Sequence, residues 1–466
     1  MGNMLVPFPK ALCRLLTVSF LFEFFTVNAT VHNYTVTTTA DYISTPVSGS
    51  LRYAIFQANS NPLGDQNNIS FSISGSGYQT INLIGGDLEI DVKISIDGTT
   101  QNSSRDYTKN DPLIIINGPN QDVCFQLVCD AAYGDDASGS SLTGLTFLNF
   151  YNGIAYTGLF STTLLKNITV KNCVFVTGNH NINIHALYSG IVSYKAIDSS
   201  SITGCYFGTN HYSNDTTYLD QGIVLSVTDT PHSTKAILIG GAGVQANVFY
   251  YYFVGIGCTG NTYNDDFVHR VQITQNSFLK PNPSDITLPE CKAINLDRIL
   301  EKGENDSIKA PIITSVNSLT KTASGTSGHD YKIEVFNCNG YQTAITYQGS
   351  TMADHSGNWS FSGLTMPSFL DQFVATATDS VNNTSELSNI GLTTKPTISD
   401  SIYCGSTTNV LSVSSGYGSY QWYKNGSAIS GATSNSYSAT SSGSYYVKVT
   451  ISGVTGTLTS YTYAVL

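Results

Sequence analysis

Short runs of alternating apolar and polar residues dominate the chain after residue 65. In the segment 88–97, LEIDVKISID, nearly every second residue is apolar, and the same period marks the segment 69–73, ISFSI. This alternation is typical of strands that are buried on one face. Similar short segments follow at 113–117 and 142–150. The pattern therefore predicts a mainly β protein.

One segment departs from the period of two. In GSLRYAIFQANSNP, residues 49–62, the apolar positions recur at i, i+3, i+4 and i+7, namely Leu51, Ala54, Ile55 and Ala58. This spacing predicts a short amphipathic helix with one apolar stripe.

A repeat organises the strands between residues 168 and 278. Four segments end in Phe, at Phe175, Phe207, Phe249 and Phe278, and carry Cys or Asn two positions earlier, at Cys173, Cys205, Asn247 and Asn276. A Gly-Ile mark also recurs, beginning at Gly153, Gly190, Gly222 and Gly255. The distance from Phe to the next marked Gly is constant in the first two repeats, whereas total repeat length varies. This combination predicts stacked coils of a β-solenoid, in which equivalent residues form ladders.

The predicted helix has a role in such a solenoid. The first coil leaves apolar core and an unpaired strand edge open to water. We expect the stripe from Leu51 to Ala58 to cover that end. The alternative is a surface helix beside an ordinary β-sandwich.

Several phrases resemble a known family. SLRYAIFQAN (50–59) is similar to the Ser-Leu-Arg-x-Ala-Ile-x-x-Ala-Asn opening of large secreted bacterial β-helix proteins. The resemblance continues through 69–101 and 204–249 and covers roughly residues 34–300. It implies a right-handed parallel β-helix. It implies no single activity, because such helices carry lyases, hydrolases, adhesins and passive stalks.

The composition changes near residue 305, and two further modules follow. The segment 331–389 is similar to small Ig-like modules that follow β-helices in such proteins. The segment 420–449 also resembles an Ig-like module, with Trp422 as the core Trp and Tyr445 as the corner Tyr. Val447 stands where antibody domains have a Cys, so no disulfide is expected between the sheets.

The predicted fold class is therefore all-β, a right-handed parallel β-helix with an N-terminal helical cap followed by two Ig-like β-sandwich domains. The expected parts are a signal peptide at 1–29, the β-helix at 30–305, and the Ig-like domains at 306–394 and 395–466. We expect the two Ig-like domains to act as spacers.

The net charge and the first 29 residues indicate possible partners and where the protein is expected to be located. Charged residues make up 11% of the chain, the net charge is −11, and no Lys/Arg cluster occurs, which argues against nucleic acid or an anionic membrane as partner. Lys10 and Arg14 flank the apolar run 15–27, and the small residues at 27–29 predict signal cleavage after Ala29. The run is shorter than the ~20 residues of a membrane span. We expect a secreted or cell-surface protein with no membrane span after cleavage.

Cysteine spacing leaves two disulfide candidates. No C-x-x-C occurs, so a zinc site is not expected. Cys173 and Cys205 share a ladder position on neighbouring coils, where a disulfide or two thiols are both possible. Cys124 and Cys129 form a second candidate pair, across a short loop.

One segment has the residue types of an acid–base site. YNDDFVHR (263–270) offers Asp265, Asp266, His269 and Arg270, and paired carboxylates beside a His suit work on a glycosidic bond. The competing interpretation, which we prefer, is a loop between coils, where Asp and Asn make turns.

Metal and phosphate motifs are weaker still. His180 and His185 in NHNINIH would need a third ligand to hold a metal. LIGGAG (238–243) belongs to the repeat and opens no helix after a βαβ strand. We therefore predict no catalytic, cofactor-binding or metal residues.

These features favour a non-catalytic exported protein that contacts an extracellular polysaccharide or cell-surface glycan, or that serves adhesion, along its long face. A polysaccharide lyase or glycoside hydrolase on the same fold and a structural stalk are the alternatives. Tyr and Thr repeats in the last module offer either a sugar-stacking face or ordinary strand surface.

Overall fold

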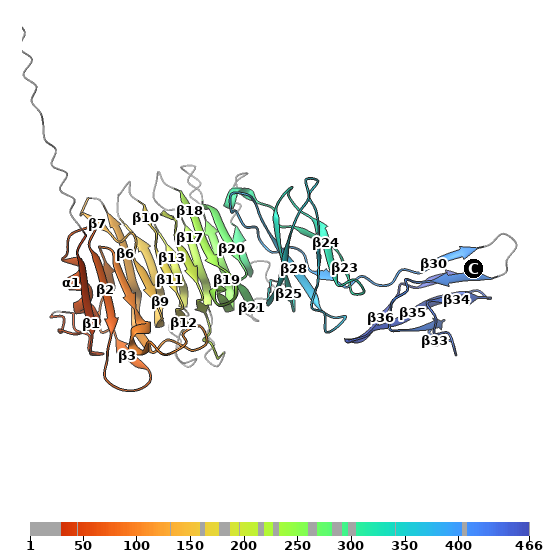
Figure 1. Ribbon diagram of the computed structural model, residues 1–466, viewed down its shortest axis with the longest axis horizontal. Helices are drawn as coiled ribbons and strands as arrows, with labels where there is room; N and C mark the ends of the chain where they lie inside the picture. Colours follow the sequence, from red (N-terminus) through yellow and green to blue (C-terminus); the bar gives the residue numbers. More distant parts are fainter. Residues whose placement is uncertain are drawn as a thin grey trace, which may run out of the picture.

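The molecule is an elongated β-solenoid followed by two antiparallel sandwiches in succession (Figure 1). The computed structural model describes residues 29–465 except 44, 131, 159–163, 177–186, 195, 213–218, 227–232, 260–267, 282–290, 297–303, 341 and 403–407. The predicted signal peptide, 1–29, lies outside the described residues except for its last residue.

One parallel sheet, sheet A, runs the length of the solenoid. Its neighbouring strands are β1 (Val31–Val36), β2 (Gln66–Phe71), β5 (Ile94–Asp97), β8 (Ser141–Thr143), β11 (Thr169–Lys171), β15 (Ser201–Thr203), β18 (Thr234–Gly240) and β20 (Val268–Thr274), with β10 (Leu165–Lys166) and β14 (Ile197–Asp198) in a side branch. Each strand adds one rung, and the inward residues form an apolar column that includes Ile69, Ile96, Leu142, Val170, Ile202, Ile239 and Ile273.

A second parallel sheet, sheet B, forms the remaining walls. It contains β3 (Gln79–Asn82), β4 (Leu88–Ile90), β6 (Ile114–Asp130), β9 (Leu145–Thr157), β12 (Val174–Val176), β13 (Leu187–Ser193), β16 (Tyr206–Phe207), β17 (Leu219–Ser226), β19 (Val248–Thr259), β21 (Ser277–Pro281) and β22 (Lys292–Leu296). A short strand, β7 (Asp135–Asp136), pairs with the end of β6. The predicted parallel solenoid is confirmed.

The repeated Phe residues form one internal column. Ring centroids of Phe175 and Phe207 lie 4.8 Å apart, those of Phe207 and Phe249 lie 4.9 Å apart, and those of Phe249 and Phe278 lie 4.8 Å apart. Phe147 extends the stack at 4.7 Å from Phe175. These spacings match the ~4.8 Å separation of hydrogen-bonded strands, so each ring stacks on its equivalent in the next rung.

The Gly-Ile mark is explained by the same column. A Cβ at Gly190 would lie 2.6 Å from Cδ1 of Phe207 and 2.8 Å from the carbonyl oxygen of Gly222. Only a residue without a side chain lets the Phe ring and the next backbone approach this closely. Gly153, Gly222 and Gly255 have equivalent contacts.

The side-chain amides of the repeated Asn residues form hydrogen bonds with backbone groups inside the solenoid. Asn247 Oδ1 accepts a hydrogen bond from the Cys205 amide at 2.8 Å, and its Nδ2 donates to the Ile202 carbonyl at 2.9 Å. Asn276 Oδ1 accepts from the Asn247 amide at 3.0 Å. The buried amides thereby satisfy backbone groups at the turn between the two sheets.

The helix α1 (Leu51–Asn59) lies at the first end of the solenoid and packs against β1, β2 and β4 (Figure 1). Its four stripe residues are buried, as predicted, and Ser50 caps the first turn by accepting from the Tyr53 amide. Asn59 donates from Nδ2 to the Glu89 carbonyl at 2.9 Å and accepts from the Asp91 amide at 3.2 Å. The helix therefore covers the core and also pairs backbone groups of β4.

The first sandwich closes the opposite end. It packs a sheet of β23 (Ile312–Asn317), β24 (Thr322–Thr326) and β27 (Asn358–Ser362) on a sheet of β25 (Lys332–Cys338), β26 (Thr346–Met352), β28 (Gln372–Thr378) and β29 (Gly391–Leu392). Phe336, Ala344 and Val374 join the hydrophobic core of the solenoid. The expected role of spacer is therefore too narrow for this module, because it also caps the solenoid.

Side-chain oxygens replace a neighbouring strand along the last edge, β20. Five backbone amides in or just after β20 donate to side-chain oxygens at 2.5 to 3.1 Å. The pairs are Val268 with Glu304, Arg270 with Asn383, Val271 with Asn305, Ile273 with Thr384, and Gln275 with Glu334. An edge strand that is satisfied in this way offers no template to another chain.

The second sandwich comprises β30 (Ser399–Ile402), β31 (Asn409–Ser412) and β34 (Ser436–Ala439) in one sheet, and β32 (Ser419–Lys424), β33 (Ser427–Ala428), β35 (Gly443–Ile451), β36 (Val454–Thr459) and β37 (Tyr463–Val465) in the other. Trp422 is fully buried between the sheets. Tyr445 donates from its hydroxyl to the Ser441 carbonyl at 2.7 Å. These are the predicted core Trp and corner Tyr of an Ig-like module.

Candidate functional site

A polar array covers the outer face of sheet A. On each side of the buried apolar column, the alternate residues of every strand point outward. We define the array as the outward residues of β1 to β15: Asn33, Thr35, Asn68, Ser70, Ser95, Asp97, Ser141, Thr143, Thr169, Lys171, Ser201 and Thr203. Nearly all of them are half-buried or exposed.

Hydrogen bonds between rungs hold parts of this array in place. Asn68 Nδ2 donates to Asn33 Oδ1 at 3.0 Å, and Ser141 Oγ donates to Ser95 Oγ at 2.8 Å. Side chains restrained on rigid strands lose little further conformational entropy when they bind a ligand. The array is therefore partly preorganised.

The chemistry of the array is that of a polyol surface. Hydroxyl and amide groups both donate and accept hydrogen bonds. Asp97 and Lys171 are its only charged members, with opposite signs, and Asp97 is already engaged by the Thr99 amide at 2.9 Å. Neighbouring rungs lie ~4.8 Å apart, so the six strands from β1 to β15 offer a surface about 24 Å long.

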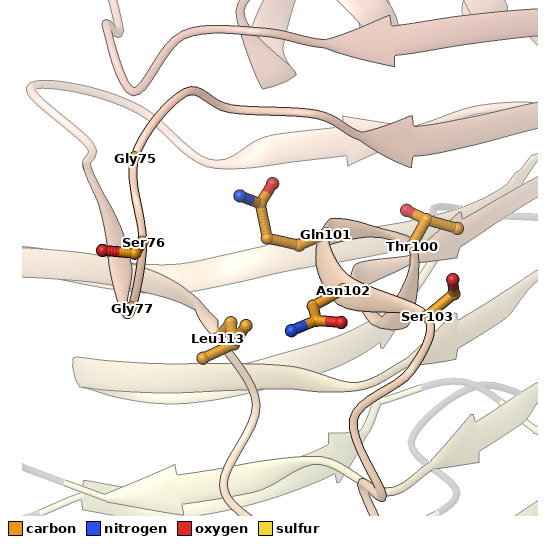
Figure 2. Close-up of a pocket in the computed structure, with 8 residues that line it drawn as sticks. All are labelled: Gly75, Ser76, Gly77, Thr100, Gln101, Asn102, Ser103 and Leu113. Atoms are coloured by element: carbon orange, nitrogen blue, oxygen red, sulfur yellow. The ribbon is translucent and has the colours of Figure 1, made fainter.

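A pocket of about 340 Å³ lies where β2 and β5 end, beside Ser70 and Asp97 of the array. Figure 2 shows Gln101 and Asn102 facing the loop of Gly75, Ser76 and Gly77, with Leu113 between Gly77 and Asn102 at the lower edge. None of the lining residues is ionisable. The pocket therefore offers polar recognition and no acid–base group.

Two of the pocket residues also support the fold. Gln101 accepts from the Ile73 amide at 2.9 Å and donates to the Ile73 carbonyl at 2.8 Å, and Thr100 Oγ1 accepts from the Phe71 amide at 2.7 Å. The 3₁₀ turn η1 (Gly98–Asn102) is thereby tied to the end of β2, which keeps this pocket wall in position.

The sequence predicted the alternation but not the array as a site. The signal is present in the short strands Ser-Leu-Thr (141–143), Thr-Val-Lys (169–171) and Ser-Ile-Thr (201–203), each with one apolar residue between polar ones. Only the register of sheet A shows that these positions align from rung to rung.

The acid–base candidates of the sequence are only partly described. Asp265 and Asp266 lie outside the described residues, as do His180 and His185, the two histidines considered as metal ligands. His269 Nδ1 lies 3.9 Å from Asp306 Oδ1, and the Arg270 amide donates to Asn383 at 2.6 Å. The His269 side chain and the Arg270 backbone therefore lie at the junction with the first sandwich.

The cysteine candidates have different outcomes. Cys173 and Cys205 are buried thiols at the same position of adjacent rungs, so the structure brings them together and the disulfide remains a prediction. Cys124 and Cys129 lie in one continuous strand, β6, with no loop between them. Five extended residues span about 16 Å, which exceeds the reach of a disulfide. The second pairing is therefore wrong.

The Tyr-rich face of the second sandwich is mostly self-paired. The rings of Tyr423 and Tyr446 stack with centroids 4.7 Å apart and 5° between their planes. Lys448 Nζ lies 5.0 Å from the Tyr423 ring centroid. These contacts occupy ring faces that a sugar would need, which favours the interpretation of an ordinary strand surface.

Asp91, at the helix-capped end, gives a pH-dependent prediction. Its burial, together with nearby Glu89 and Asp135, raises its pKa to about 6. The folded state then binds the proton more tightly than the unfolded state, so the stability falls as pH rises from about 4 to 6. Asp91→Asn keeps an oxygen to accept from Asn59 Nδ2. We expect this variant to raise the melting temperature by about 2 °C at pH 7, with no difference below pH 4.

Asp106→Asn is the matched control, measured by the same thermal unfolding at several pH values. Hydrogen bonds from Thr108 and Lys109 lower the pKa of Asp106 to about 2. Its substitution should therefore have the opposite sign at neutral pH. Equal melting temperatures for wild type and Asp91→Asn at pH 7 would contradict the assignment.

Comparisons with known proteins place the chain in no family. No protein-family model matches it, and no curated protein sequence matches it. A solved structure described as "Biofilm associated protein - BSP domain" matches at 16% identity and a TM-score of 0.16, over 34% of this chain and 29% of that chain. The chain thus spans less than a third of that structure.

A second solved structure, "Central Fibronectin-III array of RIM-binding protein", matches at 14% identity and a TM-score of 0.14, over 35% of this chain and 70% of that chain. At these identities and TM-scores, neither likeness indicates a function for this chain. Among the described residues, none of the helices has the length and apolar character needed to cross a membrane.

Proposed function

We propose that this chain is an extracellular, non-catalytic protein that binds a neutral polysaccharide along the polar array of sheet A. The observation that carries the proposal is the alignment of hydroxyl and amide side chains over six consecutive strands. A polymer of hydroxyl groups matches this surface, because each rung exchanges similar hydrogen bonds with it.

The length of the array supports a polymer rather than a single small ligand. Each hydroxyl contact is weak, but contacts repeated along one rigid surface add up once the first has formed. The pocket lined by Gln101 and Asn102 adds a recess at one margin, where a sugar unit or a chain end fits.

The charge of the array favours a neutral over an acidic polymer. Asp97 and Lys171 cancel, so no net charge is available to attract uronic acids. Binding should therefore change little between low and high salt, unlike an association that depends on ion pairs.

Affinity electrophoresis against a panel of neutral and acidic polysaccharides tests the proposal. The wild-type chain should be retarded by at least one neutral polymer, equally at low and moderate salt. Changing Ser141 and Thr169 together to Glu places two carboxylates on adjacent rungs. We expect an affinity loss of about tenfold, which corresponds to ~1.4 kcal/mol.

Thr157→Glu is the control, because Thr157 is a half-buried outward residue of sheet B. Retardation that is the same for wild type and the double variant would contradict the role of the array. Absence of binding to the whole panel would contradict the proposed function. Release of new reducing ends from any polymer would show the enzymatic alternative instead.

A further inference from the structure

Two loops of the first sandwich bring together two histidines and one aspartate. His329 and Asp330 precede β25, and His355 lies between β26 and β27. The Asp330 Oδ2 atom lies 3.4 Å from His329 Nδ1 and 3.2 Å from His355 Nδ1. The two imidazole centroids are 5.6 Å apart. One ligand atom from each of the three residues therefore lies within 4.8 Å of the other two.

These separations are longer than those of two buried or half-buried His–Asp pairs in the same chain and shorter than the 3.9 Å between His269 and Asp306. His32 with Asp65 and His211 with Asp111 are both 2.9 Å apart, the length of a normal hydrogen bond. The distances around Asp330 Oδ2 are longer. The two distances, 3.4 and 3.2 Å, are close to the ligand–ligand separation of about 3.3 Å that metal–ligand bonds of ~2.0–2.1 Å give in a tetrahedral site.

The backbone holds the two loops together independently of the three side chains. The Ser327 amide donates to the Gly357 carbonyl at 2.8 Å, and the Asp330 amide donates to the Asp354 carbonyl at 3.3 Å. Asp354 in turn accepts from the Ser356 and Asn358 amides at 2.8 Å. The ligand atoms are therefore close without a metal, so binding needs little ordering of the chain.

We propose that His329, Asp330 and His355 form a binding site for a divalent transition-metal ion of the zinc class. Two imidazole nitrogens and one carboxylate oxygen suit zinc, copper or nickel, whereas calcium and magnesium prefer oxygen ligands alone. The side chains are 72%, 61% and 91% exposed, so the remaining coordination positions face solvent. An ion bound there would link the loop before β25 to the loop before β27.

The sequence contains no sign of this site. His329 and His355 are 26 positions apart, and neither belongs to a recognised ligand spacing. Only the pairing of the two loops brings them together. The proposal is independent of polysaccharide binding by the polar array.

Calorimetric titration of the tag-free full chain with ZnCl₂ tests the site, after treatment with EDTA and removal of the chelator. Wild type should bind one equivalent at this site and should show a higher melting temperature with zinc than without it. His329→Ala and His355→Ala should each weaken binding by at least ~10-fold and abolish the thermal shift. All three side chains are exposed, so these variants should fold.

Asp330→Asn keeps an oxygen but removes the charge, and Asn tolerates the left-handed backbone at this position, where φ is 60°. It should bind zinc more weakly than wild type. His32→Ala is the control, since it removes a histidine with a single carboxylate partner. No binding by wild type, equal binding by wild type and the two loop variants, or an equal loss in His32→Ala would overturn the proposal.

Discussion

Asn305→Ala is expected to lower the free energy of unfolding by about 4 kcal/mol. Asn305 is fully buried between the last rung and the first sandwich. Its Oδ1 accepts from the Val271 amide at 2.9 Å, and its Nδ2 donates to the Val271 and Thr384 carbonyls at 3.0 and 2.7 Å. Alanine would leave the Val271 amide and the Thr384 carbonyl without this partner, each at a cost of about 1.5 kcal/mol. The Val271 carbonyl would still accept from the Thr384 amide at 3.1 Å.

The backbone adds to this loss. Asn305 has a φ of 54°, in the left-handed region, where Ala costs about 1 kcal/mol more than Asn or Gly. Chemical denaturation followed by circular dichroism measures the effect. Asn305→Gly, which loses the same hydrogen bonds but fits the left-handed backbone without strain, should be intermediate.

Asn33→Ala is the control for this experiment, because Asn33 is exposed at the opposite end and pairs only with Asn68 among the described residues. It should change the stability by less than about 0.5 kcal/mol. If Asn305→Ala behaved like this control, the side-chain oxygens along β20 would not be closing the solenoid.

Phe207→Ala is the second large expected effect, a loss of about 4 kcal/mol. Phe207 is fully buried and stacks on Phe175 and Phe249 on both sides. Its truncation leaves a cavity in the middle of a continuous column, and the rungs cannot collapse into it because backbone hydrogen bonds hold their spacing.

Phe207→Leu is the matched variant, since it keeps most of the apolar volume and should cost about half as much. Thermal or denaturant unfolding of both proteins checks the order. A Phe207→Ala protein as stable as Phe207→Leu would show that the column does not restrain the spacing between rungs.

The sequence determined the features that depend on short spacings along the chain. The period of two in 88–97, the recurring Phe from Phe175 to Phe278, and the stripe from Leu51 to Ala58 each describe one rung or one turn of helix. The stacking of the Phe rings and the burial of the stripe follow from those local patterns. In the second sandwich, the sequence likewise identified Trp422 as a core residue and Tyr445 as the corner Tyr that bonds the backbone.

The closure of the solenoid at β20 was decided only by the tertiary structure. Asn383 and Thr384 reach amides more than a hundred positions away in the chain, and no local pattern marks an Asn or Thr for that task. The same holds for the His329–Asp330–His355 cluster and for the failure of Cys124 to meet Cys129. Periodicity specifies which face of a segment is buried, whereas the partner of a polar atom depends on how separately folded segments are placed in space.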